Sequence, residues 1–178
     1  NMSFLNVSFN KSRVQFSSCM FNCTLEVKWY LDVNVSDRLN GPLQSANVSG
    51  TNRTEYLIFS ELTNSQGIIL RQNLTDYLQN GSGELNKTFA SNYTVNASRN
   101  SYGNQSKKLN FTTNTILNFS LNSLPVVSNV VLNSSSGLNL SSDDLNVYYS
   151  KSDLDNDNVT VITNWYLNST SLTVLNLP

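Results

Sequence analysis

Alternation of apolar and polar side chains with a period of two is the feature of this sequence that most restricts its fold. Within Lys87–Arg99, Tyr93 and Val95 alternate with Asn and Thr, and several other segments repeat the pattern. Such alternation places the apolar side chains on one face of a β-strand and the polar ones on the other. Ala occurs only three times in 178 residues and no long amphipathic helix pattern is present, so we predict an all-β fold.

Turn signals divide the chain into short strands. Asn, Gly and Pro cluster at Asn40–Pro42 and Asn80–Gly83, where chain reversals are favoured. We interpret Ile68–Leu78 as a short helix or a covering loop. Short strands with such turns are typical of a β-sandwich. The predicted strands are Ser3–Phe9, Arg13–Ser18, Thr24–Val35, Thr54–Ser60, Lys87–Arg99, Lys107–Thr113, Val126–Leu132, Leu145–Tyr149, Val159–Leu167 and Leu172–Leu175.

A module boundary is predicted at Leu124–Pro125. Residues 1–124 carry 10 basic and 7 acidic residues, whereas residues 125–178 carry 1 basic and 5 acidic residues. An internal repeat supports two modules, since Asn22–Asp32 matches Asn158–Asn168, with an Asn-x-Thr motif seven residues before Trp-Tyr-Leu in each. We therefore expect Trp29 and Trp165 to occupy equivalent core positions in a central strand of modules 1–124 and 125–178.

Asparagine is concentrated in N-glycosylation sequons, Asn-x-Ser/Thr. Of 29 Asn residues, 19 begin a sequon, whereas random placement of the Ser and Thr residues would give about 7. Turn chemistry or compositional bias is the alternative explanation, but bias alone does not account for the excess. We predict glycosylation at sites drawn from Asn1, Asn6, Asn10, Asn22, Asn34, Asn47, Asn52, Asn73, Asn80, Asn86, Asn92, Asn96, Asn104, Asn110, Asn118, Asn133, Asn139, Asn158 and Asn168.

Strand parity places most of the tested sequons away from the core. Asn92 and Asn96 fall on the face opposite Tyr93 and Val95, where a glycan could extend into solvent. The same holds for Asn34, Asn110, Asn118, Asn158 and Asn168 relative to their apolar neighbours. Asn6 and Asn10 are exceptions, because they share parity with Phe4.

Composition excludes several classes of function. The chain has no His, 13% charged residues and a net charge of −1, which removes most routes to acid–base catalysis and gives no basic patch for nucleic acid. No apolar run approaches the roughly 18 residues of a membrane span. No signal peptide is visible, so we expect a mature or excised piece. We predict a protein that is not an enzyme and that requires no cofactor.

Three acidic residues form a candidate cation site. Asp153, Asp155 and Asp157 alternate just before a predicted strand, and carboxylate oxygens are the ligands that Ca²⁺ prefers. The segment lacks the Gly and the distant Glu of an EF-hand loop. The alternatives are a calcium site and a solvated turn without metal.

Cys19 and Cys23 are the only cysteines. They could form a disulfide, remain as two buried thiols or supply half of a metal site, although two Cys without His cannot complete a tetrahedral zinc site. A glycosylated protein outside the cell meets an oxidising environment, which favours the disulfide. We predict a Cys19–Cys23 disulfide.

Outward-facing aromatic residues could bind sugars. By parity, Tyr30 and Tyr166 point away from the neighbouring Trp residues, and Tyr148 points away from Tyr149. The alternative is an ordinary sheet surface covered by a neighbouring module or by a glycan.

These residues together resemble a known group of proteins. The segment after Pro125, with SNVVLNSSSGLNLSSDDLNVYYS, resembles the Ig-like or PKD-like repeats of large archaeal surface glycoproteins, and NYTVNASRNSYGNQSKKLNFTT is similar to the last two strands of a PKD-type sandwich. The resemblance implies stalks or spacers between ligand-binding domains. The second module has about four predicted strands where a sandwich needs about seven. We expect a short variant, a chain that continues beyond Pro178, or completion by a neighbouring strand.

The sequence thus predicts tandem Ig-like (PKD-like) β-sandwich modules, 1–124 and 125–178, of a cell-surface or extracellular filament or stalk protein with a structural and protective role. N-linked glycans and neighbouring copies or modules of the same assembly are the expected partners. The alternatives are an adhesin or carbohydrate-binding module and an accessory domain of a secreted enzyme.

Overall fold

The computed structural model describes residues 2–16, 23–81, 86–90 and 92–171. The chain divides into two compact units, Asn1–Ser123 and Leu124–Pro178, and each has its own sheets. Strands dominate both units, with one short 3-10 helix, η1 (Lys11–Arg13), in the described part of the chain. The all-β prediction is confirmed.

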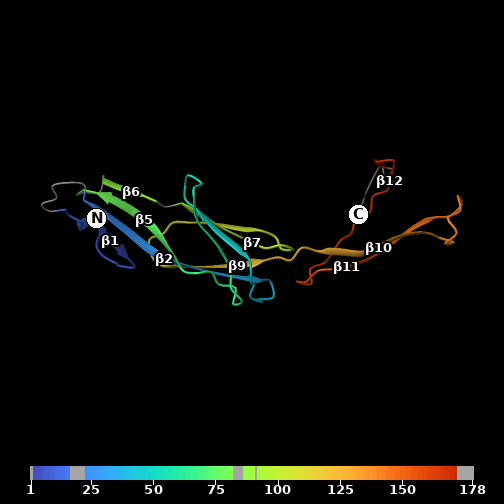
Figure 1. Ribbon diagram of the computed structural model, residues 1–178, viewed down its shortest axis with the longest axis horizontal. Coiled ribbons are helices and arrows are strands. Elements are labelled where there is room, and N and C mark those ends of the chain that lie inside the picture. The colour runs from blue at the N-terminus through green and yellow to red at the C-terminus, as the bar shows by residue number, and fades with distance from the viewer. Residues whose placement is uncertain (1, 17–22, 82–85, 91, 172–178) are drawn as a thin grey trace. The chain divides into compact units, whose positions relative to one another are not determined.

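Two sheets build the first unit (Figure 1). One has the order β1-β2-β5-β6, with β9 also paired to β2, and the other has the order β4-β3-β7-β8. Both β1 and β9 run parallel to β2 at different positions along it, whereas β5 is antiparallel to β2. The strands are β1 (Met2–Leu5), β2 (Thr24–Asp37), β3 (Asn47–Thr51), β4 (Leu57–Leu62), β5 (Gln72–Asn80), β6 (Lys87–Phe89), β7 (Tyr93–Ser98), β8 (Gln105–Leu109) and β9 (Thr115–Leu121).

The core lies between these two sheets. Every second residue of β2 is buried from Leu25 to Val35, each at most 4% exposed. The second sheet contributes buried side chains from β3, β4 and β7, and β9 adds Phe119 and Leu121. The hydroxyl of Tyr93 in β7 donates to the carbonyl of Thr75 in β5 at 3.0 Å, which joins the sheets directly. The first unit is therefore a β-sandwich, as predicted.

The prediction of a helix or loop over Ile68–Leu78 is wrong for most of its length, since β5 begins at Gln72. A β-bulge explains why the sequence pattern misleads here. Val27 pairs with Tyr77 and Lys28 pairs with Thr75, so Asp76 is the extra residue. Both Asp76 and Tyr77 are consequently buried, and the period of two is interrupted in the middle of the strand.

Other predicted elements differ in their limits. Lys87–Arg99 is not one strand but two, β6 and β7, which belong to different sheets. The predicted strand Arg13–Ser18 begins in η1, because the side chain of Asn10 caps that helix by accepting from the amide of Ser12; residues 17 and 18 lie outside the described residues. The segment of β3 was not predicted as a strand.

The second unit holds a long hairpin and a short one. β10 (Val126–Ser134) pairs antiparallel with β11 (Leu145–Ser152), and β12 (Tyr166–Leu167) pairs with β13 (Thr170–Ser171). Of the residues in β10, only Ser134 is buried. A two-stranded sheet has no opposing layer among the described residues, so its apolar side chains stay exposed.

The expectation of equivalent core tryptophans is wrong. Trp29 is buried in β2 at 4% exposure, whereas Trp165 is half-buried and precedes β12. The predicted strand Val159–Leu167 is irregular up to Trp165, because no second sheet in the described residues gives it a face to cover. The predicted strand Leu172–Leu175 lies outside the described residues.

Gly67 lies in a turn that is hydrogen-bonded to the C-terminal half of β2. Its φ is +74°, its carbonyl accepts from the amide of Val35 at 2.7 Å, and its amide donates to the carbonyl of Asn64 at 2.9 Å. A Cβ built at this position would lie 2.3 Å from the carbonyl oxygen of Val35. Gly67 therefore meets both a conformational and a steric requirement.

We predict that Gly67→Ala lowers the free energy of unfolding by about 3 kcal/mol. Gly81→Ala is the matched control, since its φ is +85° but the nearest atom to an added Cβ is 3.6 Å away; it should lower the same quantity by about 1 kcal/mol. Urea unfolding followed by tryptophan fluorescence measures both. Equal losses in the two variants would contradict the steric role of Val35.

Candidate functional site

The sequon asparagines lie at the surface. Asn1 and Asn22 are outside the described residues; of the 17 others, 14 are exposed, 3 are half-buried (Asn34, Asn52 and Asn96), and none is buried. The described asparagines outside sequons are also never buried. Exposure thus permits glycosylation at all 17 sites but does not by itself distinguish sequons from other asparagines.

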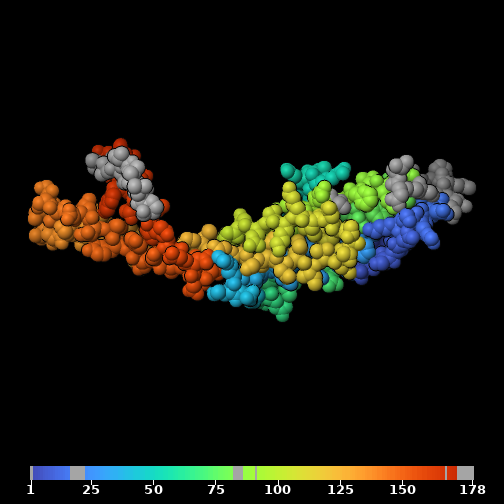
Figure 2. Space-filling model, turned by 180° about the vertical axis from the view of Figure 1, so that it is seen from behind, coloured from blue at the N-terminus to red at the C-terminus, as the bar shows by residue number. Residues whose placement is uncertain are grey.

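Strand parity places several sequons as predicted. In β7, Tyr93 and Val95 are buried while Asn96 between Val95 and Ala97 is half-buried. In β9, Phe119 is buried and Asn118 is exposed; this strand is drawn in gold on the face shown in Figure 2. Asn34 likewise alternates with buried neighbours in β2. The sequon asparagines of these strands point away from the core.

The two parity exceptions are not strand residues. Asn6 follows β1 with a φ of +57°, and its Oδ1 accepts from Nδ2 of Asn114 at 2.7 Å. Asn10 is the N-cap of η1. Both are exposed, because the chain leaves the extended conformation after Leu5 and parity counted from Phe4 no longer applies.

Two sequons adopt the same local turn. At Asn10, Oδ1 accepts from the amide and the hydroxyl of Ser12 at 3.1 and 2.7 Å. At Asn52, Oδ1 accepts from the amide and the hydroxyl of Thr54 at 3.0 and 2.8 Å. In each turn the sequon hydroxyl therefore contacts the carboxamide oxygen of its own asparagine, and Nδ2 is directed away from that bond.

One pair of sequons meets across neighbouring strands. Asn34 and Asn118 are register partners in the parallel pairing of β2 with β9, and Nδ2 of Asn34 donates to Oδ1 of Asn118 at 2.9 Å. A glycan on Asn34 would have to share this space with the side chain of Asn118. Asn118 is the more exposed of the two.

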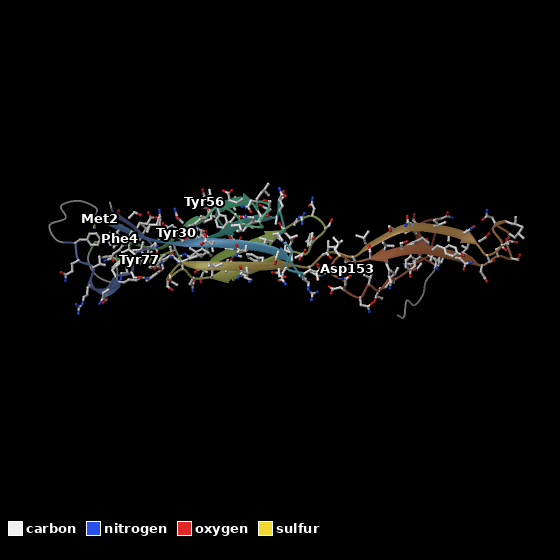
Figure 3. The ribbon with its side chains drawn as sticks, turned by 90° about the horizontal axis from the view of Figure 1, so that it is seen from below. Met2, Phe4, Tyr30, Tyr56, Tyr77 and Asp153 are labelled. Carbon is white, nitrogen blue, oxygen red and sulfur yellow. The ribbon has the colours of Figure 1, made fainter. Side chains whose placement is uncertain are left out.

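The acidic turn of the second unit uses one carboxylate for its own backbone. Oδ1 of Asp153 accepts from the amides of Asp155 at 2.9 Å and Asp157 at 3.3 Å; Figure 3 labels Asp153. No group of three acidic, His or Cys side chains placed to hold a metal ion occurs within the described ranges. Calcium binding at Asp153, Asp155 and Asp157 stays a prediction.

Cys19 lies outside the described residues, so the Cys19–Cys23 disulfide also stays a prediction. Cys23 immediately precedes β2 and is half-buried. The carbonyl of Cys23 accepts from the amide of Gly81 at 3.2 Å, which fixes its main chain beside the end of β5.

The aromatic residues considered for sugar binding differ in access. Tyr30 in β2 is half-buried, and the guanidinium of Arg71 lies 4.8 Å from its ring centroid. Arg71 is itself held by Asp32 through two hydrogen bonds of 2.8 and 2.9 Å, which raise the pKa of Arg71 above its usual value. Tyr148 and Tyr166 are 60% and 64% exposed.

An apolar cavity of about 310 Å³ lies at one side of the sandwich. Leu78 and Phe89 of the first sheet line it together with Ile58 and Tyr93 of the second. Tyr93 is 3% exposed, and burial raises the pKa of its phenol above the ordinary value of 10.0. Tyr93 and Thr75, which the 3.0 Å hydrogen bond joins, both line this cavity.

A buried carboxylate is the feature that the sequence analysis missed. Asp76 is 1% exposed and contacts the ammonium of Lys11 and the indole N–H of Trp29. The sequence shows an acidic residue between Leu74 and Tyr77, and without knowledge of the bulge an acidic side chain there is expected to face solvent. Asp76 is the only buried acidic residue in the described part of the chain.

None of the helices in the described ranges is long and apolar enough to cross a membrane.

No protein-family model matches the sequence, and no curated protein matches it. Three solved structures share part of the strand arrangement. A DUF3823 family protein from Parabacteroides merdae has 13% identity, a TM-score of 0.38 and coverage of 71% of this chain and 58% of its own. A Bacteroides uniformis protein to which carbohydrate binding is attributed has 9% identity, a TM-score of 0.37 and coverage of 70% and 52%. The Bacillus anthracis TIE protein has 13% identity, a TM-score of 0.40 and coverage of 71% and 27%.

The chain thus spans from about a quarter to three-fifths of the length of these bacterial proteins. Identities of at most 13% and TM-scores of at most 0.40 do not place it in any of their families. The resemblance to archaeal PKD-like repeats stays a prediction.

We predict that Tyr93 makes the first unit sensitive to alkaline pH. Its raised pKa means that the folded state holds the phenol proton more tightly than the unfolded state. The corresponding stability is present below about pH 10 and is lost as the pH rises through the higher folded pKa. Tyr93→Phe should therefore show a shallower fall in the free energy of unfolding above about pH 10 than the wild type.

Urea unfolding at a series of pH values measures this difference. Tyr56→Phe is the control, because Tyr56 is 70% exposed and its loss should leave the wild-type slope unchanged. A Tyr93→Phe slope equal to that of the wild type would contradict the assignment.

Proposed function

We propose that this chain is an extracellular, non-enzymatic β-sandwich module that carries N-linked glycans and serves a structural and protective role. The observation that carries the proposal is the combination of 19 sequons with their placement. All 17 described sequon asparagines keep access to solvent, including those inside strands that bury every second residue.

The sequons also flank the edges of the sheets. Asn86 immediately precedes edge strand β6, and Asn104 and Asn110 bracket edge strand β8. Edge strands present unpaired backbone groups that can pair with other chains. Glycans at these positions would cover the ends of the edges, and the charges of Lys107 and Lys108 would protect the middle of β8.

In this proposal the sandwich acts as a spacer. A two-sheet core resists deformation, while the glycans hinder proteases and neighbouring sheets from reaching the backbone. Other copies of the chain or other modules of the same surface assembly would be its partners. The predicted disulfide Cys19–Cys23 would tie the segment before β2, and an accessory role beside a secreted enzyme is the remaining alternative.

Glycosylation is tested by producing the full chain in a glycosylating host and mapping the modified asparagines by mass spectrometry. We expect occupancy at exposed Asn118 and at half-buried Asn52, whose side chain lies in a surface turn. Thr54→Ala should abolish the glycan on Asn52, because the sequon requires a hydroxyl at this position, whereas Thr54→Ser should retain it. Asn64, which is exposed but outside a sequon, should remain unmodified. Unmodified asparagines throughout would refute the proposal.

Carbohydrate binding is a second candidate function, favoured by the exposure of the β10–β11 hairpin. Tyr148 is 60% exposed and Tyr149 is 42% exposed, so both faces of this sheet offer an aromatic ring. Exposed aromatic rings are the usual platforms for apolar sugar faces. Tyr30 is less suitable, because Arg71 already covers its ring.

We predict that a glycan array detects binding that Tyr148→Ala reduces at least tenfold if this second function holds. Tyr30→Ala serves as the comparison and should leave the signal within about twofold. Absence of any array signal for the wild type would exclude carbohydrate binding by the β10–β11 hairpin without affecting the glycosylation proposal.

A further inference from the structure

The pair formed by Lys11 and Asp76 differs from the other ion pairs of the described residues. Nζ of Lys11 lies 2.5 Å from Oδ2 of Asp76, and the two side chains are 33% and 1% exposed. In the pair of Lys28 with Glu26 both side chains are about equally open to solvent, at 30% and 28%. Of these two lysine–carboxylate pairs, only the pair of Lys11 with Asp76 has a carboxylate that is buried from water.

The surroundings of the pair are aromatic. The indole N–H of Trp29 donates to Oδ2 of Asp76 at 3.1 Å. Nζ of Lys11 lies 5.7 Å from the ring centroid of Trp29 and 5.5 Å from that of Tyr77. Figure 3 labels Tyr77 and Phe4 at the same end of the first unit, and Val27 of β2 pairs with both of them in the sheet. Such a pocket offers few water molecules to compete with the amine.

Backbone contacts hold both partners in place. The carbonyl of Asp76 accepts from the amide of Ala90 at 2.9 Å, beside the bulge that turns its side chain inward. Lys11 begins η1, and its carbonyl accepts from Nζ of Lys87 at 2.9 Å. Two groups held in contact in this way react as if at very high effective concentration.

We propose that the side chains of Lys11 and Asp76 join covalently as an amide. A proton passes from the ammonium to the carboxylate that it touches, which leaves an amine and a carboxylic acid. The nitrogen lone pair attacks Cγ and forms the C–N bond. A second proton moves from nitrogen to the departing oxygen, the C–O bond breaks and one water molecule leaves. Ammonium plus carboxylate thus yields amide plus water, and neither oxidant nor reductant is needed.

Trp29 has a specific part in this step. Its N–H contacts Oδ2, the oxygen that accepts the proton of Lys11 and departs as water, and a fixed donor at that oxygen stabilises the negative charge that develops on it as the C–O bond breaks. Lys87 acts only as a positioning residue, since it holds the main chain of Lys11 and its ammonium faces the same Tyr77 ring at 5.3 Å.

The cross-link would join segments that are 65 residues apart in sequence. It would tie the segment that follows β1 to β5. In the sheet, β2 lies between β1 and β5. A force applied through the N-terminus would load β1 first, because β1 precedes Lys11, but beyond Lys11 it would pass through the cross-link into β5 and would not extend the chain between Lys11 and Asp76. The inference goes beyond the proposed function and does not depend on glycosylation.

The test is the intact mass of the full chain made without glycosylation, reduced and denatured. We expect the wild type to be lighter than its sequence mass by one water, about 18 Da, and fragmentation to reveal one branched peptide that joins Lys11 to Asp76. Lys11→Arg should have its full sequence mass, because a guanidinium does not form the bond. Lys28→Arg is the matched control and should retain the loss.

Two further measurements separate the bond from an ion pair. Trp29→Phe keeps an aromatic ring in the core but lacks the N–H, so the fraction of cross-linked chain should fall at least tenfold at a fixed time after synthesis. Lys11→Arg should unfold roughly 10 °C below the wild type, because the unfolded chain is no longer constrained. A full sequence mass for the denatured wild type overturns the proposal, whatever the variants do.

Discussion

Burial of one face of β2 is the constraint on which the first unit depends. This strand of 14 residues pairs with β1, β5 and β9, and its inward residues form one side of the core along its whole length. Because β1 and β9 take different portions of the same edge, neither covers β2 alone. The turn at Gly67 and the short segment at Leu43 complete the hydrogen bonding of its far half.

The bulge in β5 changes the chemistry of this core. Without the extra residue at Asp76, the side chains of Asp76 and Tyr77 would lie on opposite faces. With it, an acidic group enters an aromatic pocket, where burying it requires compensation by a cation and a hydrogen-bond donor. Lys11 and Trp29 supply both, from segments far apart in the sequence. The same arrangement that makes an isolated carboxylate tolerable also brings an amine against it.

The two units show how far a hydrophobic pattern can be trusted. In β7 the alternation around Val95 predicts the buried face, because an opposing sheet is present to cover it. In the second unit the match of Trp165 to Trp29 predicts a core strand that the described residues do not contain. Alternation of apolar and polar residues predicts which side chains share the apolar face of a strand. Those side chains are buried only where a second layer packs against that face. Sequence similarity between the two Trp-Tyr-Leu segments carries no information about that layer.

The sequence by itself determined the all-β class of the chain, the outward direction of Asn96, Asn118 and Asn34, and the surplus of sequons, because each follows from residue spacing along one strand. Only the tertiary structure decided that Asp76 lies in the core, that Lys11 reaches it and that Trp165 does not repeat Trp29. These outcomes depend on a bulge and on which sheets face one another, and both are set by pairings between distant segments. Local periodicity predicts which residues lie on each face of a strand, but it does not predict which other strands pair with it or pack against it.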